Sequence, residues 1–279
     1  MTERFSDYSC FRDAAVGITG HRGVLGRLLY ERLRANDVAV EAYEGDINHA
    51  ATLQEWFRRR SLRFFFHFAA IVPIVRVDAD PIKAYETNVI GAFNVCREIL
   101  RTQPQCWLFH ASSSHVYRPT SDASPIPEDA ELAPQTFYGV TKLAAERVIE
   151  PLLQRMSAPY CIGRIFSFSH ETQQEPYLVP SLRKRIAELR DGETLTVTNP
   201  SAVRDIQDAE GIIDCILHLA SKQAVGIVNI GTGVGTSVRQ IAARIARELN
   251  KNIRIDGVDR DMPGALIADT SKLQHLLSK

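Results

Sequence analysis

The sequence predicts an α/β fold in which helices cover both faces of a parallel, doubly wound sheet. Two observations predict it. Short apolar segments alternate with helical patterns from about residue 14 to residue 166. The first apolar segment runs into a glycine-rich turn and then a helical pattern. With 279 residues, 45% of them hydrophobic, the chain is long enough for one large domain and a smaller lobe.

The overall charge gives no reason to expect a nucleic acid or an anionic membrane as a partner, because 33 basic residues balance 33 acidic ones. No apolar run reaches the length of a membrane span, and the N-terminal residues lack a signal-peptide core. The five cysteines are scattered without metal-ligand spacing. We therefore expect a cytoplasmic protein with reduced cysteines and no metal site.

The first strand, predicted over residues 14–19, leads into Gly20-His21-Arg22-Gly23-Val24-Leu25-Gly26 and a helix over residues 27–36. Gly20 would permit a tight turn, Gly23 would let a pyrophosphate approach the backbone, and Gly26 would let helix and strand pack closely. The free N–H groups of the helix N-terminus would face the phosphates. This stretch predicts a dinucleotide site.

The second strand, Val38–Tyr43, passes almost at once into Gly45-Asp46-Ile47 and a helix over residues 49–60. An acidic residue after this strand usually binds the adenosine ribose. Glu41 and Glu44 are both nearby, and the sequence does not choose between them. Arg22 would suit the 2′-phosphate of NADP, but a solvated loop arginine is an equally good interpretation of the residue alone.

Small and hydroxyl residues follow the third and fourth predicted strands. Residues 63–68 end in His67-Phe68-Ala69-Ala70, where small side chains would let a cofactor approach. Asn88 lies inside a predicted helix over 81–101, so a specific polar contact is expected there. The strand over 106–110 leads into Ser112, Ser113 and Ser114. Ligands bind at this edge of such sheets, although serines also simply favour turns.

Tyr138 and Lys142 lie four residues apart in a predicted helix over 137–157 and would therefore share one face. A phenol has a reference pKa of about 10, and a lysine cation beside it would lower that pKa. The pair could then exchange a proton with a hydroxyl or a carbonyl oxygen. An exposed helical face remains an alternative until other parts of a site are found.

The C-terminal part is less regular after a strand over 159–166. Predicted helices cover 178–189, about 207–220, 237–250 and the end of the chain from 271. Predicted strands cover 195–198, 226–230 and a short stretch near 253, and Arg204-Asp205-Ile206 precedes the helix that ends at about 220. The helix over 178–189 is basic and would present either a solvated face or an anion site. We expect a small lobe that closes over the sheet.

Several motifs in fixed order resemble the extended short-chain dehydrogenase/reductase family of nucleotide-sugar epimerases, dehydratases and reductases. They are TGHRGVLG at 19–26, GDI at 45–47, HFAA at 67–70, TNVIGAFNV around Asn88, SSSHVY at 112–117, YGVTK at 138–142, RDI at 204–206 and NIGTG at 229–233. The resemblance implies an N-terminal extension at 1–13 and a Rossmann-like NAD(P)-binding domain at 14–166. It also implies a mainly substrate-binding lobe at 167–279, with Rossmann elements returning around 204–233.

The resemblance also implies roles for individual residues. Tyr138 would be the general acid/base, Lys142 would hold the nicotinamide ribose, and Ser113 would bind the reacting oxygen. His115 stands where related enzymes carry dehydrating or epimerising groups and could still move protons. The implied cofactor-binding set is Gly20, His21, Arg22, Gly23, Val24, Leu25, Gly26, Asp46, Ile47, Phe68, Ala69, Ala70, Asn88, Tyr138, Lys142 and Ile165. The implied substrate-binding set is Ser114, Tyr177, Arg183, Arg204 and Arg260.

Departures from the family patterns narrow the expected reaction. The 4,6-dehydratases carry an Asp-Glu pair where this chain has Ser114-His115, and the His of the GDP-fucose synthases corresponds here to Tyr177. The GHRG turn resembles those synthases and favours NADP(H), with NAD(H) as the alternative. The short connection between Val38 and Asp46 resembles the 4-keto-6-deoxysugar reductases.

The resemblance therefore implies NADP(H)-dependent reduction of a 4-keto (6-deoxy) nucleotide-sugar. The alternatives are an NAD-dependent nucleotide-sugar 4-epimerase and a non-catalytic dinucleotide-binding sensor. The resemblance also implies a homodimer through the helices over 81–101 and 137–157.

Overall fold

A six-stranded parallel sheet forms the centre of the computed structural model, which describes residues 3–260 and 264–278. The strand order is β2-β1-β3-β4-β5-β9. The bounds are β1 Val16–Thr19, β2 Val40–Tyr43, β3 Phe64–His67, β4 Trp107–Ser113, β5 Tyr160–Ile165 and β9 Gly226–Ile230. The predicted fold class is confirmed. The order reverses between β1 and β3, and ligands of doubly wound sheets bind at such a point.

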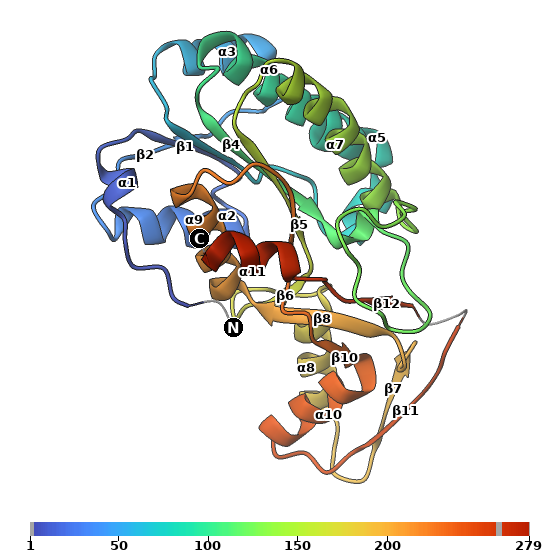
Figure 1. Cartoon of the computed structure of the whole chain (residues 1–279). Helices are drawn as coiled ribbons and strands as arrows, with labels where there is room; N and C mark the ends of the chain where they lie inside the picture. Colours follow the sequence, from blue (N-terminus) through green and yellow to red (C-terminus); the bar gives the residue numbers. More distant parts are fainter. Residues whose placement is uncertain (1–2, 261–263, 279) are drawn as a thin grey trace.

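Helices cover the two faces of this sheet (Figure 1). One face carries α3 (Ala50–Arg58), α5 (Pro81–Tyr85), α6 (Ala92–Thr102) and α7 (Phe137–Arg155), and the other carries α2 (Val24–Arg34), α9 (Ala209–Ser221) and α11 (Ser271–Ser278). Alternate side chains of a strand point to opposite faces. Accordingly, Phe64 and Phe66 enter one buried core and Phe65 the other.

The predicted helix over 81–101 is divided, and Asn88 lies at the division. α5 continues into a π-helical turn, η1 (Glu86–Gly91), and then into α6. Asn88 lies in this turn. Its Oδ1 accepts a hydrogen bond from the N–H of Ile71 at 2.7 Å, and its Nδ2 donates to Thr141 Oγ1 on α7 at 3.0 Å. The polar contact expected of Asn88 is confirmed. A short helix before it, α4 (Ile74–Ala79), was not predicted.

The lobe below the sheet in Figure 1 has a core of its own. α8 (Leu178–Glu188) and α10 (Val238–Glu248) pack with the parallel pair β7 (Thr194–Thr198) and β11 (Arg254–Val258). A second small sheet joins this lobe to the main body. It contains β8 (Val203–Asp208), β6 (Ser167–Ser169), β10 (Gly235–Ser237) and β12 (Ala265–Leu266).

A buried carboxylate explains why the RDI and NIGTG motifs occur together. Asp205, on β8, is fully buried and accepts hydrogen bonds from the backbone N–H groups of Thr232, Gly233 and Ala268. The hydroxyl of Thr232 also donates to it at 2.6 Å. Since buried carboxylates are stable only when they are well hydrogen-bonded, Asp205 holds these three segments together and thereby fixes the neighbouring Arg204.

The N-terminal segment packs into the main core. α1 (Ser9–Arg12) is short, but the aromatic side chains of Phe5, Tyr8 and Phe11 around it are buried. The ring of Phe11 lies 4.8 Å from that of Phe64 on β3, and the N–H of Phe5 donates to Asp214 Oδ1 on α9 at 3.1 Å. The sequence had indicated only an extension here. Residues 5–11 are part of the folded body.

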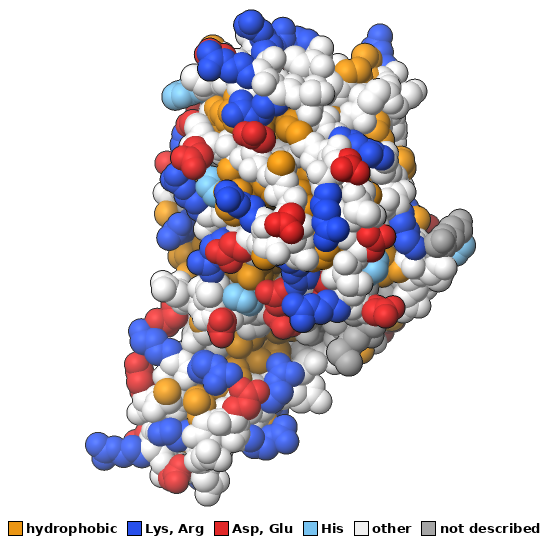
Figure 2. Space-filling view, turned by 90° about the vertical axis from the view of Figure 1, so that its left-hand side faces the viewer, with side chains coloured by type: hydrophobic (Ala, Val, Ile, Leu, Met, Phe, Trp, Pro, Cys, Tyr) orange, Lys and Arg blue, Asp and Glu red, His pale blue; other side chains and the backbone are white. Residues whose placement is uncertain are grey.

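The surface mixes charges of both signs. On the face drawn in Figure 2, basic and acidic side chains alternate over the body and the lobe, and the described residues there form no continuous basic stripe. Within residues 3–260 and 264–278, no helix combines the length and apolar character needed to span a membrane.

Candidate active site

The glycine turn after β1 has the shape of a phosphate cradle. Gly20 has φ +73°, and a Cβ on it would lie 2.5 Å from the Ala69 nitrogen, while a Cβ on Gly26 would lie 2.3 Å from the Gly20 oxygen. A Cβ on Gly23, by contrast, would meet nothing nearer than 3.4 Å. Gly23 is the N-cap of α2, and no side chain caps that helix. The backbone N–H groups of its first turn are thus left for a ligand, which fits a pyrophosphate.

Charges of both signs stand beside this cradle. Arg22 Nη2 lies 3.3 Å from Glu44 Oε2, and both side chains are exposed. His21 Nε2 lies 3.9 Å from the same carboxylate. Glu44 directly follows β2, where a ribose-binding acid is expected. The sequence left the choice between Glu41 and Glu44 open; Glu41 instead pairs with Arg60 at 3.1 Å.

The remaining predicted cofactor residues lie along the same edge of the sheet. The Asp46 carboxylate accepts from the N–H of Asn48 at 2.9 Å, and this hydrogen bond is the main cause of its lowered pKa. Ile47 is buried behind it. Phe68, Ala69 and Ala70 follow β3 and are half-buried, as are Val24 and Leu25 in the first turn of α2. Ile165 ends β5 and is paired with Ser113.

Ser113 and Tyr138 meet because three local features bring β4 and α7 together. β4 continues to Ser113, three residues beyond its predicted end, since its pairing with β5 continues that far. Thr136 caps α7 by accepting from the N–H of Gly139 at 3.1 Å. A Cβ on Gly139 would lie 2.2 Å from the His115 oxygen, so glycine permits the close approach. The Ser113 side chain then lies close enough to Tyr138 to lower the pKa of the phenol.

Lys142 lies one turn after Tyr138 and is buried. Its Nζ donates to the carbonyl oxygen of Ala111 on β4 at 2.8 Å. Burial lowers the pKa of Lys142 to about 8, against the opposing effect of the Glu146 carboxylate. Burial likewise raises the pKa of Tyr138 to about 12, against the opposing hydrogen bond with Ser113. The Tyr138 shift is thus opposite in direction to the lowering expected from a neighbouring cation, because burial outweighs other effects.

His115 lies beside Tyr138, in a short 3-10 turn, η2 (Ser114–Val116). Its ring centroid is 5.6 Å from that of Tyr138, with the rings edge to face. Burial and, to a smaller extent, the nearby Arg204 cation together lower the pKa of His115 to about 4. The imidazole is therefore neutral near pH 7. Ser114, in the same turn, is buried.

Two predicted substrate residues lie near the candidate catalytic residues, Arg204 near His115 and Tyr177 near Tyr138. The Arg204 guanidinium is half-buried, and its Nη1 donates to the oxygens of Val203 and Gly264 at 2.8 and 3.0 Å. Among the described residues no carboxylate lies within ion-pair distance of it. Tyr177, at the N-cap of α8, is close enough to Tyr138 to raise its pKa.

The other two predicted substrate residues lie elsewhere in the lobe. Arg183 forms an exposed ion pair with Glu248 of α10. Arg260 is exposed, and its backbone N–H donates to Asn199 Oδ1 at 2.7 Å. The sequence also missed two features near the cleft. Arg76 on α4 lies close enough to Tyr177 to affect its pKa, and a buried Arg164–Glu146 ion pair lies behind the catalytic residues.

The fold and the site together define a class of protein. A Rossmann-like sheet with a glycine cradle after β1 is a dinucleotide-binding scaffold. Ser113 beside Tyr138, with Lys142 one helical turn away, defines on that scaffold a short-chain dehydrogenase/reductase.

Comparison with known proteins supplies the family. The family model described as GDP-mannose 4,6 dehydratase matches residues 18–276, and the chain belongs to this family within the extended short-chain dehydrogenase/reductases of nucleotide-sugars. The chain is 25% identical over 260 residues to a UDP-glucose 4-epimerase of Halalkalibacterium halodurans, covering 85% of this chain and 77% of that protein.

Solved structures share the fold. The UDP-glucose 4-epimerase of Thermotoga maritima with UDP-glucose superposes with a TM-score of 0.83 at 19% identity, over 94% of this chain and 91% of that one. The dTDP-4-dehydrorhamnose reductase of Bacillus anthracis in complex with NADP superposes with a TM-score of 0.81 at 19% identity, over 94% and 92% of the two chains. An enzyme of NAD(P)-dependent type follows from the family.

Proposed function

We propose that this protein reduces a 4-keto (6-deoxy) nucleotide-sugar to the 4-hydroxy sugar with NADPH. The observation that carries the proposal is the placement of Ser113 beside Tyr138, close enough to lower the Tyr138 pKa, with the buried Lys142 one turn along α7. The three groups stand at the carboxyl edge of the sheet, on the same edge as the glycine cradle. That arrangement suits a carbonyl held between the pair and a dinucleotide.

The chemistry divides between the cofactor and the chain. The bound dinucleotide would supply a hydride to the keto carbon. Tyr138, which a pKa of about 12 keeps protonated near pH 7, gives its proton to the carbonyl oxygen. Ser113 donates a hydrogen bond to the same oxygen, and each such donor is worth about 3 kcal/mol in related chemistry. Lys142, a cation below about pH 8, would bind the nicotinamide ribose.

Two further features support this reaction. Arg204 is a half-buried cation that donates to backbone carbonyls, so a diphosphate can supply the counter-charge that the described residues do not. Ser114-His115 lacks the acidic pair of a dehydratase, and the neutral His115 makes a poor proton donor near pH 7. Reduction at C4 needs neither group.

The test is a screen of NADPH oxidation against GDP-, dTDP-, UDP- and CDP-linked 4-keto-6-deoxysugars. We expect one nucleotide to support turnover well above the others, because the nucleotide supplies much of the binding. The Tyr138→Phe variant, which keeps the ring and loses the proton, is the control. Turnover that persists at the wild-type rate in this variant would refute the mechanism.

A second candidate is an NAD-dependent nucleotide-sugar 4-epimerase, and Glu44 favours it. A carboxylate after β2 suits the free ribose hydroxyls of NAD and repels a 2′-phosphate, whereas Arg22 beside it attracts one. The curated relative is itself named an epimerase. Protein that is purified with bound NAD and interconverts UDP-glucose and UDP-galactose without added cofactor would establish this candidate. Activity only with added NADPH would exclude it.

We also propose that the protein forms a homodimer through α5, η1 and α7. Exposed apolar side chains gather on these helices, and buried apolar area is what stabilises such interfaces. They are Ile82, Tyr85, Ile90, Phe137, Val140 and Val148.

Light scattering of Ile82→Glu/Val140→Glu tests the dimer, with Val258→Glu as the control. Val258 is a lobe residue that is 74% exposed, like Ile82. We expect a monomer for the double variant and a dimer for the wild type and the control. A wild-type monomer would disprove the interface.

A further inference from the structure

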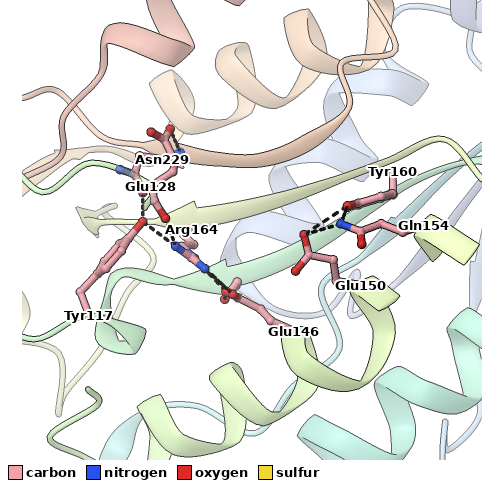
Figure 3. Close-up of polar contacts among 9 residues, drawn as sticks. Tyr117, Glu128, Glu146, Glu150, Gln154, Tyr160, Arg164 and Asn229 are labelled. Atoms are coloured by element: carbon pink, nitrogen blue, oxygen red, sulfur yellow. Dashed lines mark hydrogen bonds and ion pairs between the residues drawn. The ribbon is translucent and has the colours of Figure 1, made fainter. Parts of the chain in front are cut away.

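An ion pair lies entirely inside the molecule, behind the catalytic residues (Figure 3). Arg164 on β5 and Glu146 on α7 are each only 2% exposed, and Arg164 Nη2 lies 2.8 Å from Glu146 Oε2. Arg164 Nε also donates to the same carboxylate. Removing both charges from water is costly, so this pair demands a close geometric fit between strand and helix.

The pair belongs to a larger network. Arg164 Nη1 donates to the hydroxyl of Tyr117 and to the carbonyl oxygen of Glu128, both at 2.8 Å. Tyr117 in turn donates to Asn229 Oδ1 on β9 at 2.7 Å. Figure 3 shows the guanidinium reaching both groups, with Tyr117 on one side and Glu146 on the other. The loop before α7 and the strands β5 and β9 are thus held in one arrangement.

The network reaches the catalytic residues by two short routes. Glu146 follows Lys142 by one helical turn, on the same face of α7. The hydroxyl of Ser112, adjacent to Ser113 on β4, donates to the other oxygen of Glu146. The carboxylate therefore fixes the rotation and height of α7 against the strand that carries Ser113. A displacement of about 1 Å in such a constellation can reduce turnover by about 100-fold.

We propose that Arg164 and Glu146 are positioning residues for the reaction: they set the catalytic helix against β4, so that Tyr138 meets Ser113 and Lys142 stays near the cofactor. This inference rests on the roles proposed above for Tyr138 and Lys142. The Glu146 carboxylate also acts on the charge of Lys142 and favours its protonated form. Two other titratable groups lie near Lys142, the imidazoles of His67 on β3 and His110 on β4. Both imidazoles are neutral near pH 7, because burial lowers the pKa of His67 to about 3 and that of His110 well below its usual value.

The test compares Glu146→Gln with Glu150→Gln, since both residues are on α7 one turn apart. Glu150 accepts from Gln154 and Tyr160 at 3.2 Å each and forms the separate cluster in Figure 3. In Glu146→Gln we expect kcat to fall at least about tenfold, with the KM of the sugar nearly unchanged. In Glu150→Gln we expect both constants to stay close to wild type.

Fluorescence titration with NADPH and NADH from pH 6 to 10 gives a second readout that needs no sugar. Binding by the wild type should weaken above about pH 8, where Lys142 loses its proton. The midpoint should move to lower pH in Glu146→Gln, because a carboxylate that favours the cation is lost, and should not move in Glu150→Gln. If no sugar supports turnover, the proposed function fails while this titration still tests the inference.

A milder variant, Ser112→Ala, keeps the inference testable if Glu146→Gln does not fold. Ser112→Ala keeps both buried charges and removes only the link between Glu146 and β4. We expect its thermal unfolding to stay close to wild type and its kcat to fall several-fold. A folded Glu146→Gln with wild-type kcat and pH midpoint would overturn the inference. If that variant is unfolded, a wild-type kcat in Ser112→Ala would overturn it instead.

Discussion

Two parts of the candidate active site differ in how their charged residues are buried: the chemical end around Lys142 and the cofactor end around Arg22 and Glu44. At the chemical end, Lys142 and the Arg164–Glu146 pair are buried, and every one of these charges is hydrogen-bonded inside the protein. At the cofactor end, Arg22 and Glu44 form an ion pair with side chains 76% and 66% exposed. Exposed pairs contribute about 0–1 kcal/mol, whereas breaking a buried pair costs about 3–5 kcal/mol.

The difference in burial determines which charged residues can be substituted without loss of stability. A substitution at Arg22 or Glu44 alters the field at the adenosine ribose and leaves the core intact. A substitution at Glu146 or Arg164 leaves an unpaired charge in the core and moves the catalytic helix. The cofactor preference can therefore vary at little cost to folding, while the proton chemistry is tied to stability.

The largest expected effect is at the chemical end, from Tyr138→Phe. In the proposed mechanism the phenol is the proton source, so kcat should fall by about 10²–10⁴-fold. The Kd for NADPH should stay within about twofold, because the ring remains in place. Steady-state kinetics and a fluorescence titration measure the two quantities. A parallel loss of cofactor binding would mean that Tyr138 acts on binding instead.

The next effect contrasts two glycines of the cradle. Gly26→Ala would place a Cβ 2.3 Å from the Gly20 oxygen, so we expect about 1–3 kcal/mol of destabilisation together with loss of cofactor binding. Gly23→Ala has a nearest contact of 3.4 Å and should keep its stability. Its methyl group would stand where the phosphate approaches and should weaken binding alone. Thermal unfolding and cofactor titration separate the variants, and equal stability loss in both would contradict the assignment.

The pH dependence of kcat/KM tests the chemical end in the wild-type protein, without a mutation. Lys142 has its pKa lowered to about 8, so the cation is present below about pH 8 and is lost above it. Tyr138, at about 12, stays protonated over the same range. We expect kcat/KM for reduction to fall above pH 8 by up to about tenfold per unit. A flat profile to pH 10 would show that the lysine charge is not needed.

The smallest effect is expected at the exposed pair. Glu44→Gln removes a carboxylate beside Arg22 and should shift the ratio of kcat/KM for NADPH over NADH upward by about three- to tenfold. Arg22→Gln should shift the ratio downward by a similar factor. Both variants should unfold at the wild-type temperature. A lower unfolding temperature in either variant would contradict the view that the exposed Arg22–Glu44 pair, unlike the buried Arg164–Glu146 pair, contributes little to stability.

Much of the fold could be predicted because strand and helix patterns alternate clearly. The glycine turn and the polar contact of Asn88 followed from residue type and spacing, and the family followed from the resemblance of several motifs in fixed order. The catalytic residues Ser113, Tyr138 and Lys142 are predictions that their mutual contacts support. α4 escaped prediction because six residues between a proline and an aspartate give too little periodicity.

The positioning pair could not be predicted because spacing does not reveal burial. Glu146 sits in a helix among charged neighbours, where an acidic residue usually lies on a solvated face. Arg164 interrupts an apolar strand, and nothing in the sequence names its partner 18 residues earlier. The predicted lowering of the Tyr138 pKa was wrong for the same reason, because spacing does not reveal burial. The burial of Tyr138, which distant segments set, outweighed the effect of the neighbouring cation that the sequence could show.

The aromatic residues near the N-terminus have a consequence for how the chain is made. Phe5 is made about 200 residues before Asp214 of α9, which accepts a hydrogen bond from its backbone N–H. At about 5–20 residues per second, this is a delay of about 10–40 s. Throughout that interval the ring of Phe5 lacks its edge-to-face contact with His218 of α9, so the segment around Phe5 can complete its packing only after α9 has been made.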